Sequence, residues 1–129
     1  MNHSSKTLAF VSSAFNEAEN LAELYQRCRI TFEGLQREFI GRYSLDFSFV
    51  VADNGSIDNT LEVLEELRSR DPAVVVLANR MNYGAEASVG NLIDQARVYD
   101  FVVLLCSDLQ DPPELAVEMV RNLLEHHEL

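Results

Sequence analysis

Residues 101–114, FVVLLCSDLQDPPE, carry the pattern that decides the fold. The apolar first half predicts a buried strand, and the polar second half predicts a loop leaving the end of that strand. Packing a core does not require the acidic and amide side chains that crowd into this loop, which are Asp108, Gln110, Asp111 and Glu114. The stretch therefore predicts both a strand of the sheet and a polar site at its carboxyl end.

Short, β-branched apolar runs alternate with longer helical patterns along the whole chain. The predicted strands cover residues 8–11, 47–52, 73–78 and 101–106, and the predicted helices cover about 20–39, 61–67, 85–97 and 113–124. The strand runs are nearly continuous in apolar residues, which is typical of parallel strands covered on both faces. Residues 1–129 are therefore predicted to form a single domain, a Rossmann-like three-layer α/β/α fold with a mainly parallel sheet.

Composition and charge exclude several classes of function. Acidic residues outnumber basic ones 21 to 10, so the net charge of −11 disfavours nonspecific binding to nucleic acid. Cys28 and Cys106 have no zinc-like spacing, which predicts reduced thiols. The sequence shows no signal-peptide core and no apolar run of membrane-spanning length. Together these features predict a cytoplasmic protein.

The loops that leave the four predicted strands are all rich in Asn, Asp, Ser and Gly. They read SSAFNEAEN (12–20), DNGSIDNT (53–60), ANRMNYG (78–84) and CSDLQDPPE (106–114). In open parallel sheets, ligands bind beyond the carboxyl ends of the strands, where the strand order reverses. The loops contain neither a GxGxxG turn nor a P-loop, so those two phosphate-binding motifs are excluded.

Several residues in these loops suit a nucleotide. Asp53 ends a buried strand, where a carboxylate needs a polar partner such as a base N–H or a ribose hydroxyl. Phe15 offers a stacking surface, and Glu17 offers a hydrogen-bond acceptor at the same edge. Arg80 is either a fork-shaped donor to a diphosphate or base, or an ordinary surface arginine.

The last loop combines a possible cation site with a helix start. Asp108 and Gln110 present hard oxygen atoms that suit Mg²⁺ or Mn²⁺. Asp111 is predicted to cap the following helix, with Pro112 in its first turn and Glu114 completing the capping pattern.

Two earlier loops contain similar capping patterns. Asn16 is predicted to cap the first helix, with Glu19 three residues later forming a capping box. Ser56 or Asp58 is predicted to cap the second helix, although either residue could instead contact a ligand.

Together, these loops resemble the family 2 inverting glycosyltransferases with the GT-A fold, specifically their N-terminal nucleotide-sugar-binding half. The family pattern reads P-x-Y-N-E, VVDDGSTDGT, SRNxGK and DADLQDPPE at successive strands. The corresponding stretches here are SAFNE (13–17), VVADNGSIDNT (50–60), ANRMNYGA (78–85) and CSDLQDPPE (106–114). The similarity is greatest to the branch that acts on polyprenyl or dolichyl phosphates.

The resemblance implies binding of a nucleotide-diphosphate sugar, transfer of the sugar with inversion, and a bound Mg²⁺ or Mn²⁺. The implied nucleotide-sugar-binding residues are Ala14, Phe15, Glu17, Asp53, Arg80 and Asp108, and the implied metal ligands are Asp108 and Gln110. Asp53 would read the base, and Asp108 would occupy the second acidic position of the DxD motif.

This chain departs from the family pattern at three positions. Cys106 stands where the first DxD aspartate is expected, Asn54 replaces the second acid of DDGS, and Ala85 replaces a lysine. Loss of a carboxylate weakens a site for a hard cation. The alternative function is therefore a degenerate nucleotide-binding or interaction module without transferase activity.

Family members carry the acceptor half, including any catalytic base, after the DxD strand and its helix. We therefore expect a fold truncated at that helix, with no catalytic residue in this chain and no turnover by the chain alone. The expected acceptor is a lipid phosphate or a saccharide. The whole protein is expected to associate with a membrane, and homodimerisation stays open.

Overall fold

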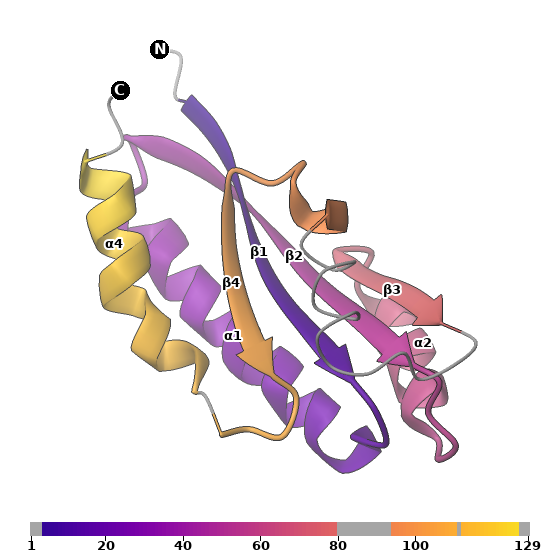
Figure 1. Ribbon diagram of the computed structural model, residues 1–129. Helices are drawn as coiled ribbons and strands as arrows, with labels where there is room; N and C mark the ends of the chain where they lie inside the picture. The colour runs from indigo at the N-terminus through magenta and orange to yellow at the C-terminus, as the bar shows by residue number, and fades with distance from the viewer. Residues whose placement is uncertain (1–3, 80–93, 111, 127–129) are drawn as a thin grey trace.

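The computed structural model describes residues 4–79, 94–110 and 112–126. In chain order the elements are β1 (Ser4–Ala14), α1 (Ala18–Glu38), β2 (Tyr43–Asn54), α2 (Thr60–Arg70), β3 (Val74–Asn79), β4 (Phe101–Cys106), the 3₁₀ turn η1 (Pro113–Ala116) and α4 (Val117–His126). Within these residues the strands form one parallel sheet in the order β3-β2-β1-β4 (Figure 1). The predicted α/β class and parallel sheet are confirmed, and the strand order reverses between β1 and β4.

The first two strands are longer than their apolar runs. β1 and β2 pair continuously from Ser4 opposite Tyr43 to Ala14 opposite Asp53. Polar residues at the strand ends take part because the ladder joins backbone N–H and C=O groups, whatever the side chain. The strand ends are consequently better defined by pairing than by hydrophobicity.

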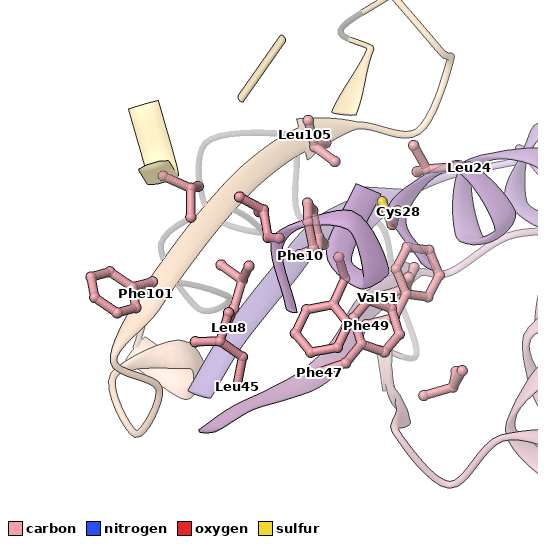
Figure 2. Packing of buried hydrophobic residues seen from close by; sticks show 14 of the residues in the cluster. Leu8, Phe10, Leu24, Cys28, Leu45, Phe47, Phe49, Val51, Phe101 and Leu105 are labelled. Carbon is pink, nitrogen blue, oxygen red and sulfur yellow. The ribbon is translucent and has the colours of Figure 1, made fainter. Parts of the chain in front are cut away.

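One face of the sheet packs against α1, α2 and α4. Phe10 and Phe49 point from the strands into this main core, where they meet Leu24 of α1, Leu64 of α2 and Leu124 of α4. All five side chains are almost fully buried, and burial of each contributes about 1.5–3 kcal/mol to stability. Figure 2 shows the strand side chains of this core together with those of α1.

Cys28 of α1 lies in the same core, close to Leu24 in Figure 2. It is a free cysteine, and burial raises the pKa of its thiol. The thiol therefore stays protonated and behaves as a small apolar side chain.

The opposite face carries smaller strand residues, among them Val11 and Val50, which cluster with Ala96. The helix predicted over 85–97 falls mostly outside the described residues. On β4, Val102 and Leu104 are 43% and 47% exposed, so the expectation of strands covered on both faces is wrong for this strand. Within the described residues, α4 packs on the opposite face of β4, which carries Leu105.

The last predicted helix, over 113–124, has two parts. It begins with the 3₁₀ turn η1 and continues as α4, whose Val120 and Leu124 face the core. Among the described helices, none has the length and hydrophobicity needed to cross a membrane.

Candidate functional site

The carboxyl ends of the strands meet at one edge of the sheet (Figure 1). Ala14 at the end of β1 pairs with Asp53 of β2, and Ser13 pairs with Cys106 of β4. Because β2 and β4 flank β1, their backbones are roughly 10 Å apart. The structure thus brings Ala14, Asp53 and the turn at 107–110 to the same edge, next to the switch point between β1 and β4.

Asp53 lies on the sheet face that α1 and α2 cover. Its neighbour Val51, two residues earlier, points into the main core, and alternate residues of a strand share a face. The Asp53 side chain is 3% exposed, and its Oδ1 accepts a long, 3.4 Å hydrogen bond from the Ser56 N–H. Phe15, which follows the last residue of β1 at the same edge, is 41% exposed.

Asn16 joins the loops that follow β1 and β2. Its Oδ1 accepts the N–H of Ile57 at 2.9 Å and of Asp58 at 3.3 Å, and its own N–H donates to the Ser56 hydroxyl at 2.9 Å. The predicted capping role is wrong, because Glu17 is the N-cap of α1 and makes no side-chain capping bond. Asn16 instead adopts a φ of 56°, which aims its side chain at the neighbouring loop.

A second link between these loops involves Thr60, a buried residue that the sequence patterns missed. The Glu17 N–H donates to the Thr60 hydroxyl at 3.0 Å, and Glu17 Oε2 accepts a bond from the Asn20 amide at 2.9 Å. Thr60 donates its N–H at 2.9 Å, and also its hydroxyl, to Asp58 Oδ1. The predicted capping by Ser56 or Asp58 is wrong, because Asn59 is the N-cap of α2 and makes no side-chain capping bond. Asp58 instead accepts the Thr60 N–H, and the Ser56 hydroxyl accepts the Asn16 N–H. The Thr60 hydroxyl lowers the pKa of Asp58.

A pair of serine hydroxyls, also missed from the sequence, anchors the chain where it leaves β4. Ser12 Oγ and Ser107 Oγ are 2.6 Å apart and buried. Each hydroxyl has one proton, so one serine donates to the other and the second donates to a strand carbonyl. Ser12 Oγ lies 2.8 Å from the Leu105 carbonyl oxygen, and Ser107 Oγ lies 3.1 Å from the Ser13 carbonyl oxygen. These bonds tie the first residue of the turn to β1.

The turn itself directs two polar side chains outward. Leu109 has a φ of 68° and packs against the main core, whereas Asp108 and Gln110 on either side of it are exposed. Asp108 Oδ1 accepts the Gln110 N–H at 3.1 Å, which orients the carboxylate. An inward apolar residue therefore separates two outward oxygen donors.

These donors fit a cation that takes most of its ligands from phosphates and water. Mg²⁺ binds in this way through one or two carboxylates. Over residues 4–79, 94–110 and 112–126, no group of three or more His, Cys, Asp or Glu side chains is placed to hold a metal ion alone. Cys106 does not add a hard ligand, since thiols favour softer metals.

Glu114 has a role different from the predicted one. The N-cap of η1 is Pro112, with no side-chain capping bond, and Asp111 lies outside the described residues. Glu114 instead accepts both arms of the Arg27 guanidinium, at 2.5 Å from Nη2 and 3.2 Å from Nε. The pair joins η1 to α1.

Arg80 and Ala85 also lie outside the described residues, so their predicted roles stay predictions.

A model of the family described as "Glycosyl transferase family 2" matches residues 10–129. The chain belongs to this family. An undecaprenyl-phosphate 4-deoxy-4-formamido-L-arabinose transferase of Pseudomonas savastanoi is 34% identical over 111 residues, which are 84% of this chain and 30% of that protein.

Solved structures with low sequence identity share the fold. Staphylococcus aureus TarS (1–349) in complex with UDP has a TM-score of 0.68 and 22% identity over 94% of this chain and 33% of its own. The mannosyltransferase PcManGT of Pyrobaculum calidifontis, in complex with GDP-Man and Mn²⁺, has a TM-score of 0.62 and 16% identity over 81% of this chain and 32% of its own. These similarities confirm the GT-A type of α/β fold. The family 2 chain spans about a third of the length of these relatives.

Proposed function

We propose that this chain is the donor-binding half of a family 2 glycosyltransferase that uses a nucleotide-diphosphate sugar. The observation that carries the proposal is the meeting of a buried carboxylate, an exposed aromatic ring and an exposed carboxylate turn at one sheet edge. These are Asp53, Phe15 and Asp108. Relatives described as sugar transferases, and neighbours solved with UDP or GDP-Man, support the same ligand class.

Each residue offers a contact suited to one part of the donor. The Phe15 ring can stack on the base, and Asp53 can accept a hydrogen bond from a base N–H or ribose hydroxyl. Ala14 pairs with Asp53 across the two strands and is proposed at the nucleotide from the family pattern. Glu17 and Arg80 are proposed at the ribose and the nucleotide from the family pattern alone.

Asp108 and Gln110 would hold a Mg²⁺ or Mn²⁺ ion that neutralises the donor diphosphate as it leaves. The chain's own contribution is an oriented carboxylate at an exposed turn, fixed by the Gln110 N–H. With Cys106 in place of an acid, we expect the ion to bind weakly until the donor phosphates complete its shell.

The proposed acceptor is a polyprenyl phosphate, by analogy with the undecaprenyl-phosphate transferase relative. An acceptor phosphate oxygen would attack the anomeric carbon while the bond to the nucleotide diphosphate breaks, which inverts that carbon. A lipid phosphate is already anionic, so it needs little help from a base. The alternative of an interaction module rests on Cys106 alone, and no other feature of the described residues favours it.

Isothermal titration of the chain with UDP- and GDP-sugars, with and without Mn²⁺, tests donor binding. Asp53→Asn should weaken the affinity about tenfold, because the charged acceptor of the hydrogen bond becomes a neutral amide oxygen. Asp46→Asn is the matched control, since Asp46 is exposed in the same strand, seven residues and about 23 Å away. Failure of every nucleotide sugar to bind would refute the proposal, as would equal effects of the two variants.

A further inference from the structure

The turn that carries Asp108 and Gln110 is followed within four positions by Glu114. Two of the intervening residues are Pro112 and Pro113, whose rings fix their φ angles and stiffen the connection. Pro113 is buried, and the Leu115 N–H bonds to the Pro112 carbonyl at 3.1 Å. A contact that holds Glu114 in place therefore acts only a few residues away from Asp108 and Gln110, the proposed contacts of the donor diphosphate.

Arg27 supplies such a constraint from α1. Its guanidinium forms the two-armed pair with Glu114, a geometry that fixes direction as well as distance. Glu23, one helical turn earlier, lies 3.5 Å from Arg27 Nη1 and orients the guanidinium. The hydrogen bond between Arg27 and Glu114 raises the pKa of Arg27 and lowers the pKa of Glu114, so both side chains stay charged near neutral pH.

We propose that Arg27 is a positioning residue for the donor: through Glu114 it holds η1 against α1 and thereby fixes the turn that presents Asp108 and Gln110. The inference rests on the proposed donor-binding function and adds a residue that does not touch the ligand. Ser107 and Leu109 anchor the turn at its start and middle, by hydrogen bonds to β1 and by packing on the core. The Arg27–Glu114 pair anchors the chain after it.

The chain contains a matched control for this pair. Arg121 of α4 forms the same two-armed pair with Glu38 of α1, at 2.6 Å from Nε and 3.0 Å from Nη2. The two arginines are similarly exposed, at 30% and 28%, and each also contacts a glutamate on its own helix. Glu38 lies eleven residues from Arg27 along α1, about 16 Å away. A purely stabilising role would make the two pairs equivalent.

The test compares Arg27→Gln with Arg121→Gln by titration with a nucleotide sugar and Mn²⁺. Arg27→Gln should weaken donor affinity about tenfold, as expected for loss of a residue that orients a ligand-binding group. Arg121→Gln should leave the donor affinity unchanged. The two variants should lose similarly little stability, because the Arg27–Glu114 and Arg121–Glu38 pairs are both partly exposed to solvent. Glu114→Gln should match Arg27→Gln, and the double variant should lose no more than either single variant.

Amide hydrogen exchange gives a readout that does not depend on the ligand. The Gln110 N–H, which bonds to Asp108, should exchange about tenfold faster in Arg27→Gln and at the wild-type rate in Arg121→Gln. Unchanged exchange in Arg27→Gln would overturn the inference. If the wild type binds no nucleotide sugar, the proposed function fails; if it does and Arg27→Gln binds equally well, only the positioning inference fails.

Discussion

Replacement of Asn16 by serine separates two interpretations of the loop after β1. Serine caps helices about as well as asparagine, so a capping residue would tolerate the change. In the structure, however, Asn16 has a φ of 56° and its side chain reaches the N–H groups of Ile57 and Asp58. Serine is too short to reach them and has less tolerance of this backbone conformation. We therefore expect Asn16→Ser to destabilise the protein.

The expected loss has two parts. The two hydrogen bonds are solvent-exposed, so each contributes about 0.5 kcal/mol, at the low end of the usual range. Holding a residue with an ordinary side chain at positive φ costs about 1 kcal/mol. The sum is about 2 kcal/mol of unfolding free energy, or roughly 6 °C in Tm for a domain of this size.

Urea denaturation followed by circular dichroism measures this difference. Asn16→Asp is the control, because aspartate keeps an acceptor oxygen at the same place and tolerates positive φ, so its stability should stay within about 0.5 kcal/mol of wild type. If Asn16→Ser were as stable as wild type, the Asn16 side chain would not join the two loops.

Two further changes test other parts of the molecule. Tyr25 donates a 2.5 Å hydrogen bond to Asp71, and burial together with this bond raises the pKa of Tyr25 to about 12. Because the pKa is raised above its ordinary value of 10, the contribution of Tyr25 to stability is complete below pH 10 and is lost as the pH rises toward 12. At neutral pH, Tyr25→Phe should be less stable than wild type by about 1 kcal/mol. Urea denaturation at several pH values should show this difference shrinking between pH 10 and pH 12. Cys106→Asp should tighten Mn²⁺-dependent binding of the nucleotide sugar about tenfold, because aspartate adds a hard ligand beside Asp108. If wild type and Cys106→Asp showed the same Mn²⁺ dependence in these titrations, position 106 would not contribute to the ion site.

The local pattern of the sequence was sufficient to predict the architecture. Apolar runs separated by helical patterns predicted four strands, and the parallel sheet follows from their number, spacing and continuous hydrophobicity. The polar loop residues predicted the edge at which Ala14, Asp53 and the 107–110 turn come together. One error concerns β4, which is not covered on both faces. The others concern partners: Asn16 and Glu114 fit capping patterns, yet they bond to residues 41 and 87 positions away, respectively.

The sequence by itself determined the class of fold, the family and the edge where polar side chains gather, because periodicity and motif spacing are properties of neighbouring residues. Only the tertiary structure decided which hydrogen bonds and ion pairs hold the loops in place. The links from Asn16 to the β2 loop, from Ser12 to Ser107 and from Arg27 to Glu114 join segments that the strand order brings together. A hydrogen bond depends on distance and direction in space, and for residues far apart in the chain those are fixed only when the sheet has formed.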